Sequence, residues 1–227
     1  MQHKKKRNRK SNSNRNNFKQ VEARTENQKD YIRAIVENDV IICVGPAGAG
    51  KSFVAAGISA QHIVQKRVEQ IIVTRPLVCA GKDIGALPGD VGEKIKPYLT
   101  PMEESLRYFL GQSHYGLYAN ERRIRFEPLE VMRGATFHNS YMILDEAQNC
   151  TLEQIKMFIT RMGENSKVLI NGDIRQTDIK KFSGLLECVD RLEGIEGVGV
   201  SRLYYEDIQR NGIIGRVLEA IEEDYYD

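Results

Sequence analysis

Residues 45–52, GPAGAGKS, combine closely spaced glycines with a lysine and a serine. Glycines let backbone N–H groups curve around a phosphate, while a lysine supplies a positive charge and a serine hydroxyl can bind Mg²⁺. The segment fits the pattern G-x-x-x-x-G-K-[ST] in full and lies between an expected strand and an expected helix, as that pattern requires. It predicts a nucleotide site with Lys51 on the β and γ phosphates and Ser52 on the metal. The expected contacts to the nucleotide are Gly45, Pro46, Ala47, Gly48, Ala49, Gly50, Lys51, Ser52 and Phe53.

A second chemical feature is YMILDEAQN, residues 141–149, in which an apolar run ends in two adjacent carboxylates. Neighbouring anions at the edge of a core repel each other and lose hydration, so they need a positive partner. In open α/β sheets, ligands lie beyond the carboxyl ends of the strands, and we expect that partner to be Mg²⁺ on the nucleotide. Asp145 is predicted to hold the ion through its waters and Glu146 to orient the water that attacks the γ-phosphate. The alternative is that both carboxylates only cap a helix beginning near Thr151.

A third segment, NGDIRQ at 171–176, repeats this design one strand later. An uncharged donor near the γ-phosphate can register whether that phosphate is present, and we assign this sensor role to Gln176. Without the two preceding motifs, the segment would be an unremarkable turn.

The elements that must position these motifs alternate along the chain. Apolar runs predict strands, and apolar side chains at helical spacing predict the helices between them. The predicted strands are 39–45, 69–74, 141–145, 167–172 and 197–205, and the predicted helices are 51–66, 101–110, 152–162, 183–192 and 213–223. This alternation predicts an α/β fold with a mostly parallel sheet and helices on both faces. Residues 75–139 interrupt this alternation of strands and helices, and we interpret them as an inserted helical segment after the second strand.

Charge is unevenly distributed over the 227 residues, although the net charge is only +2. Residues 1–19 hold eight Lys or Arg and no acidic residue. We therefore expect a disordered basic tail over residues 1–24, followed by one domain over 25–227. Such a tail can neutralise nucleic-acid phosphates, and the proposed contacts are Lys4, Lys5, Lys6 and Arg7. The alternative is a solubilising tail with no specific partner.

Composition excludes several other classes. No apolar run approaches the roughly 18 residues of a membrane span, and no apolar stretch follows the basic N-terminus as in a secretory signal. The four cysteines form no CxxC pair and the four histidines show no ligand spacing, which argues against a structural zinc site. We therefore expect a cytoplasmic protein without membrane association.

With these motifs in place, the chain resembles the PhoH-like ATPases over most of residues 25–223. The matching segments are ENQKDYIRAI, VGPAGAGKS, VTRPLVCAG, LPGDVGEKIKPYLTP, VMRGATF, ILDEAQNCTLEQIKMFITRMG and SKVLINGDIRQTD. The LPGD and MRG segments belong to no general ATPase pattern, so they make the resemblance specific. It implies a RecA-like P-loop NTPase core similar to that of superfamily 1 helicases, with ATP and Mg²⁺ as cofactors. It also implies a role in RNA metabolism, often linked to phosphate starvation in bacteria and common in phage genomes.

The resemblance extends to individual positions. It implies that Gln28 recognises adenine and that Thr74, Arg75 and Pro76 contact a nucleic-acid backbone. Arg161 and Arg210 are the candidate arginine fingers.

Two departures weaken parts of this comparison. Ala49 stands where the family usually has threonine, and DIQRNGII stands where an Arg-His-Pro sequence is expected, which puts the role of Arg210 in doubt. No PIN-type nuclease segment precedes the ATPase, so RNA cleavage is not expected.

A single RecA-like domain lacks the partner charge that helicases place across the nucleotide, and an arginine supplied in trans is worth roughly 10³ to 10⁵ in rate. We therefore expect a homo-oligomeric ring, as a hexamer, with its sites at subunit interfaces. The predicted function is Mg²⁺-dependent ATP hydrolysis coupled to binding or remodelling of RNA, or of another single-stranded nucleic acid, with RNA helicase activity as one form. Two alternatives stay open: an ATP-switched RNA-binding adaptor that never separates strands, and a P-loop kinase for small molecules.

Overall fold

The computed structural model describes residues 18–76, 91–176, 183–209 and 213–223. Six strands form one sheet: β1 (Val40–Val44), β2 (Gln70–Thr74), β3 (Ile124–Phe126), β4 (Ser140–Leu144), β5 (Lys167–Gly172) and β6 (Val198–Arg202). The helices are α1 (Glu26–Glu37), α2 (Lys51–Val64), α3 (Val91–Asn120), α4 (Leu152–Ile159), α5 (Gly184–Leu192) and α6 (Ile213–Glu223). Short 3-10 turns are η2 (Leu129–Met132), η3 (Ala147–Asn149) and η4 (Tyr205–Asp207).

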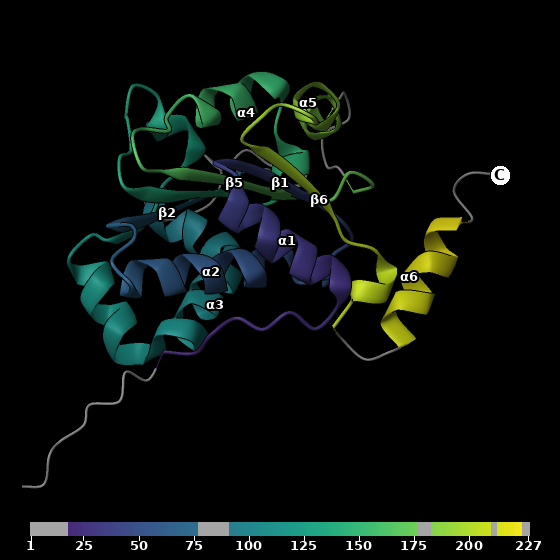
Figure 1. The fold of residues 1–227 in the computed structure, drawn as a ribbon, viewed down its shortest axis with the longest axis horizontal. Coiled ribbons are helices and arrows are strands. Elements are labelled where there is room, and N and C mark those ends of the chain that lie inside the picture. Colours follow the sequence, from purple (N-terminus) through teal and green to yellow (C-terminus); the bar gives the residue numbers. More distant parts are fainter. Residues whose placement is uncertain (1–17, 77–90, 177–182, 210–212, 224–227) are drawn as a thin grey trace, which may run out of the picture.

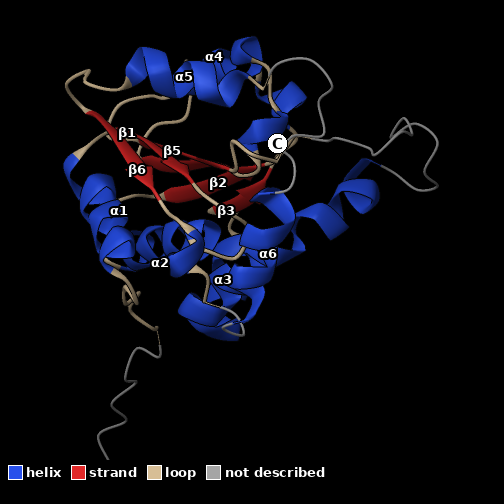
Figure 2. Ribbon diagram, turned by 90° about the vertical axis from the view of Figure 1, so that its right-hand side faces the viewer, coloured by secondary structure: helices blue, strands red, loops and turns tan. Residues whose placement is uncertain are grey.

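All strand pairs in the sheet are parallel, in the order β3-β2-β4-β5-β1-β6. Helices α1, α2 and α3 cover one face, and α4 and α5 cover the other (Figures 1 and 2). Because both faces are covered, every residue of β1 and of β4 is buried, and nearly all of these residues are apolar. This architecture confirms the predicted α/β fold with helices on both faces.

Alternate residues of β1, β2, β4 and β5 contribute to two separate cores. Ile41 and Ile143 pack with α1, α2 and α3 on one side, whereas Ile42 and Met142 pack with α4 and α5 on the other. Burial on both sides fixes the register, since a shift by one residue would exchange the two sets of side chains.

The segment after β2 is more regular than an insertion. Strand β3 pairs in parallel with β2, so α3 is the crossover helix of a β–α–β unit rather than an addition to the fold. The predicted helix over 101–110 is one part of α3, which changes direction at Gly111 (φ 72°, ψ 156°). Strand β3 was not predicted because three residues are too short for a periodic pattern to be recognised.

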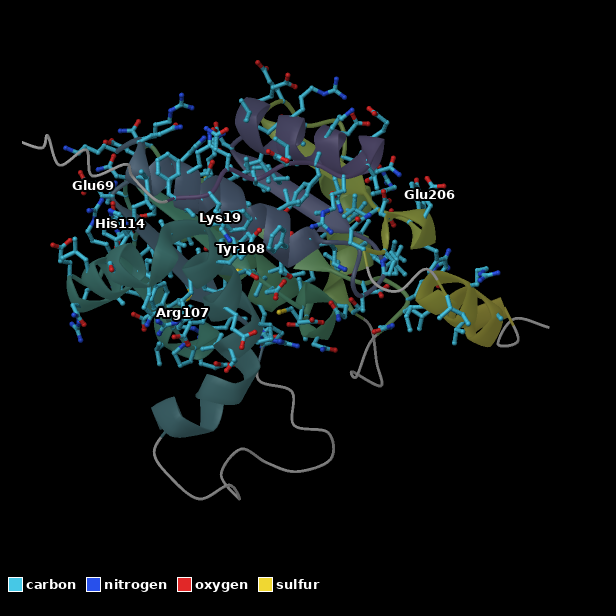
Figure 3. The ribbon with its side chains drawn as sticks, turned by 90° about the horizontal axis from the view of Figure 1, so that it is seen from below. Lys19, Glu69, Arg107, Tyr108, His114 and Glu206 are labelled. Carbon is cyan, nitrogen blue, oxygen red and sulfur yellow. The ribbon has the colours of Figure 1, made fainter. Side chains whose placement is uncertain are left out.

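The N-terminal segment joins the domain before α1 begins. The backbone N–H of Lys19 donates to the carbonyl of Phe109 at 2.8 Å, and the Lys19 ammonium lies 3.6 Å from the centre of the Tyr108 ring on α3 (Figure 3). Lys19 therefore already contacts the folded domain, six residues before the boundary expected at residue 25.

Among the described residues, no helix is both long and apolar enough to cross a membrane.

Candidate functional site

The glycine-rich segment joins the end of β1 to the start of α2, as predicted. Gly50 directly precedes α2 and has φ +96°, a left-handed conformation that glycine adopts without steric cost. A Cβ atom at this position would lie 2.8 Å from the side-chain nitrogen of Gln28. Glycine therefore lets the loop turn into the helix, whose N-terminal N–H groups form an anion site.

Gln28 is buried and connects α1 to this loop. Its Nε2 donates to the carbonyl of Ala49 at 2.9 Å, and its Oε1 accepts from the backbone N–H of Arg24 at 2.9 Å. The side-chain amide thus positions the loop backbone. The adenine-recognition role stays a prediction.

Lys51 and Ser52 lie at the mouth of the loop. The Lys51 ammonium donates to the carbonyls of Gly45 (2.6 Å) and Pro46 (2.9 Å). The Ser52 hydroxyl donates to Oδ1 of Asp145 at 2.6 Å, which joins the first turn of α2 to the end of β4. A hydroxyl and a carboxylate side by side are the hard oxygen ligands that Mg²⁺ prefers when phosphates and waters complete its shell. The residues present therefore fit a nucleotide-bound Mg²⁺.

Phe53 follows this pair and is partly exposed. Its ring packs at 4.6 Å from Phe109 and 5.5 Å from Tyr108, measured between centroids. Phe53, which was predicted to contact the nucleotide, thus also links α2 to α3.

Asp145 is held at the end of β4 by the neighbouring strand. Its backbone N–H donates to the carbonyl of Thr74 at 3.0 Å, and its side chain is buried. Burial, followed by the charge of Glu146, raises the pKa of the Asp145 carboxyl, while Ser52, Arg75 and Lys51 oppose this rise. The site thus places two adjacent carboxyl groups where a cation would be stabilised, and the metal-binding role of Asp145 stays a prediction.

Glu146 has an unusual backbone conformation, φ 57° and ψ 41°, in the left-handed region. For a residue other than glycine, this geometry is uncommon and costs free energy, and strained residues of this kind cluster at functional sites. Its carboxylate contacts two side chains: Arg75 Nη2 lies 3.2 Å from Oε1, and Gln148 Nε2 donates to Oε2 at 2.6 Å.

The third motif, residues 171–176, follows β5, which lies between β1 and β4 in the sheet. Strand β5 pairs with β1 on one side and β4 on the other, so the 171–176 segment leaves the same edge of the sheet. The backbone N–H of Asp173 donates to Oε1 of Gln148 at 3.0 Å, which links this motif to Glu146. Gln176 lies in the following turn, where its backbone N–H donates to the Asp173 carbonyl at 3.2 Å, and its side chain is exposed.

Of the three residues predicted to contact nucleic acid after β2, Thr74 and Pro76 are buried and Arg75 is partly exposed. Arg75 is thus the one whose side chain reaches solvent. Lys4, Lys5, Lys6 and Arg7 lie outside the described residues.

The two candidate arginine fingers differ in what the structure describes. Arg161 lies just beyond α4 and donates to the carbonyls of Met157 and Ala135, each at 3.2 Å. Its backbone carbonyl accepts from the backbone N–H of Phe137, which precedes the start of β4. Arg161 therefore lies near the N-terminal ends of the strands, whereas the glycine-rich loop lies at their C-terminal ends. Arg161 therefore does not line the site of its own chain, and its role as an arginine finger stays a prediction. Arg210 lies outside the described residues.

A contact that sequence reasoning missed holds the loop from the C-terminal side. The backbone N–H of Gln209 donates to the carbonyl of Gly48 at 3.2 Å. The preceding Asp207 is buried and accepts from Asn27 at 3.0 Å and from the Tyr204 backbone at 2.7 Å. No local pattern marks these residues, because their role arises from a contact between distant segments.

Comparisons with known proteins agree with this geometry. Residues 20–222 match the family described as PhoH-like protein. The PhoH-like protein of Bacillus subtilis (strain 168) is 39% identical over 207 residues, which are 90% of this chain and 65% of that protein. Protein PhoH of Escherichia coli (strain K12) is 43% identical over 202 residues, 87% of this chain and 57% of that protein. The chain thus spans less than two thirds of the length of these relatives.

Solved structures resemble the fold at low sequence identity. The UvsW helicase from bacteriophage T4 superposes with a TM-score of 0.51 at 14% identity, covering 81% of this chain and 61% of that one. The large terminase of a thermophilic bacteriophage, in complex with ADP, gives 0.51 at 14% identity and covers 86% of this chain and 49% of that one. These likenesses support a RecA-like P-loop NTPase fold. The family match over residues 20–222 and the relatives from B. subtilis and E. coli show that the chain belongs to the PhoH-like protein family.

Proposed function

We propose that this chain hydrolyses ATP with Mg²⁺ and couples hydrolysis to binding or remodelling of RNA or another single-stranded nucleic acid. One observation supports the hydrolytic part above all. The glycine-rich loop, the Ser52–Asp145 pair and Glu146 meet at one edge of the sheet, with the Ser52 hydroxyl 2.6 Å from Asp145.

Each residue has a distinct task in this proposal. Lys51 exchanges the carbonyls of Gly45 and Pro46 for oxygens of the β and γ phosphates. Ser52 and Asp145 would hold Mg²⁺, which would neutralise charge on the phosphates. Glu146 orients the attacking water, and Gln176 contacts the γ-phosphate. The task is mainly one of positioning, since phosphoryl transfer to water needs no covalent intermediate on the protein.

The nucleic-acid part is supported by the charge distribution and by the place of Arg75. The basic tail supplies cations for phosphates, and Arg75 lies at the edge of the sheet beside the proposed ATP site. A homo-oligomeric ring, expected to be a hexamer, would supply Arg161 or Arg210 to the site of the next subunit. The adjacent carboxylates disfavour the small-molecule kinase.

The decisive experiment measures the ATPase rate with single-stranded RNA, with single-stranded DNA and with no polymer. We expect Mg²⁺-dependent hydrolysis that one polymer stimulates. Absence of hydrolysis under all three conditions would refute the proposal. Strand displacement on a tailed RNA duplex then separates a helicase, which releases the strand only with ATP, from an adaptor, which hydrolyses ATP without releasing it.

A further inference from the structure

The carboxylate of Glu146 is held by two side chains that differ in how firmly they are fixed. Gln148 is buried, donates to Oε2 of Glu146 at 2.6 Å and accepts from the backbone of Asp173 at 3.0 Å. Arg75 approaches the other oxygen, Oε1, at 3.2 Å, and its side chain is 24% exposed. One partner is therefore built into the core, and the other lies at the surface.

The local structure keeps Gln148 in place. A Cβ atom on Gly172 would lie 2.9 Å from Gln148 Oε1 and 2.4 Å from Leu185, so only glycine leaves room for this amide beside β5. Moving Gln148 would also leave the buried N–H of Asp173 unpaired, which is costly. Gln148 is thus a fixed support for Glu146.

Arg75 can exchange its partner far more easily. Partly exposed ion pairs contribute little net free energy, because solvent screens them and two side chains must be ordered. A guanidinium group also binds phosphate oxygens with two parallel hydrogen bonds, a geometry that lysine does not offer. A phosphate of a nucleic acid beside β2 would therefore compete effectively with Glu146 for Arg75.

We propose that Arg75 couples nucleic-acid binding to ATP hydrolysis by exchanging Glu146 for a backbone phosphate. While paired with Arg75, Oε1 of Glu146 is not available to orient the attacking water. When a single-stranded polymer binds, its phosphate takes over the guanidinium and Oε1 is released, while Gln148 keeps the carboxylate in position. This role rests on the proposed function, since it requires Glu146 to orient water and a polymer to bind near β2.

Arg75→Gln tests the exchange, with three measurements: the ATPase rate without polymer, the rate at saturating single-stranded RNA or DNA, and polymer affinity over a range of salt concentrations. The variant is expected to hydrolyse ATP without polymer about two- to fivefold faster than wild type, as expected for loss of a partly exposed ion pair. Polymer stimulation should fall to about onefold, and the salt dependence should lose about one phosphate contact. A role confined to structure would not raise the rate without polymer.

Arg33→Gln is the matched control, because it removes the same charge from an exposed position on α1, where Arg33 pairs with Asp30. It should keep both wild-type rates. Arg75→Lys keeps the charge but not the planar group, and its stimulation should lie between those of wild type and Arg75→Gln. If Arg75→Gln no longer binds ATP, the lysine variant decides: polymer stimulation below that of wild type supports the exchange, and wild-type stimulation refutes it.

Two results would overturn the proposal for different reasons. If polymer stimulates wild type and Arg75→Gln by the same factor, the coupling role of Arg75 is wrong and the proposed function stands. If neither polymer stimulates wild type, the nucleic-acid part of the proposed function fails and the coupling role fails with it.

Discussion

At the scale of single residues, the site is a chain of contacts that joins three motifs. Ser52 contacts Asp145, Asp145 precedes Glu146, and Gln148 links Glu146 to Asp173. The left-handed backbone of Glu146 fits this arrangement, since it is maintained by neighbours that fix both the strand and the side chain. The DEAQ sequence already points to Gln148 as a residue that couples the nucleotide to the rest of the domain, and the fold adds the contacts that make it a positioning residue.

Replacing Gln148 tests this positioning role. In Gln148→Leu, Glu146 loses its fixed support, so kcat for ATP should fall about 10- to 100-fold while nucleotide affinity stays within about twofold. The unpaired N–H of Asp173 should also lower the free energy of unfolding by about 1–3 kcal/mol. Steady-state kinetics and urea unfolding measure the two effects. A wild-type kcat would show that Glu146 does not depend on Gln148.

At the scale of elements, β1, β4 and β5 bring their motifs to one edge because they are parallel neighbours. This much was predictable: continuous apolar strands, a glycine-rich turn and carboxylates at strand ends determine the fold class and the phosphate loop. Strand β3 could not be predicted because three residues are too few to show a periodic pattern. The contact from Gln209 to Gly48 could not be predicted because it joins segments that are distant in the sequence. The pairing of Arg75 with Glu146 also depends on β2 lying beside β4, which the sequence does not specify.

The junction between the loop and α2 predicts an effect on nucleotide binding. Gly50→Ala adds a Cβ at φ +96° and 2.8 Å from the Gln28 side-chain nitrogen, so the backbone is strained and the amide that positions the loop must shift. Left-handed strain of about 1–2 kcal/mol should weaken ATP affinity by about 5- to 30-fold in a direct binding titration. Gly194→Ala is the matched control, since Gly194 has φ +90° with no atom within 4 Å of the place a Cβ would take, and it should lose stability but not affinity. Equal affinities for both variants would contradict this account of the loop.

The core between α2 and β4 predicts a dependence of stability on pH. His62 is buried, with Nδ1 2.9 Å from the Tyr141 hydroxyl. Burial, then Arg67 and Lys167, lower the pKa of His62 from its ordinary 6.5 to about 4. The unfolded chain therefore binds the proton more readily between these values, and the free energy of unfolding should fall by on the order of 2–3 kcal/mol as pH drops from 7 to 4.

Urea unfolding of wild type and His62→Gln across this pH range measures the effect. The variant cannot titrate at this position, so its stability should fall less steeply as pH decreases. Parallel curves for the two proteins would show that His62 does not cause the pH dependence.

At the scale of the whole molecule, the proposed ring makes one subunit depend on the next. Arg161 lies away from its own glycine-rich loop, so a role at the nucleotide requires a second copy. Arg161→Gln and Arg210→Gln should each be mixed in equal amounts with Glu146→Gln. If one arginine acts in trans, its mixture should recover about a quarter of wild-type turnover, because that fraction of interfaces has both residues intact. A monomer that hydrolyses ATP at the full rate after dilution would contradict the ring.

The central claim is that Glu146 orients water for ATP hydrolysis at a site formed by the glycine-rich loop and Asp145. The most direct measurement compares ATP affinity and single-turnover hydrolysis for wild type and Glu146→Gln in Mg²⁺. The variant should bind ATP with an affinity within a few-fold of wild type and hydrolyse it at least about a hundredfold more slowly. Hydrolysis at the wild-type rate by Glu146→Gln would remove Glu146 from the reaction and contradict the account.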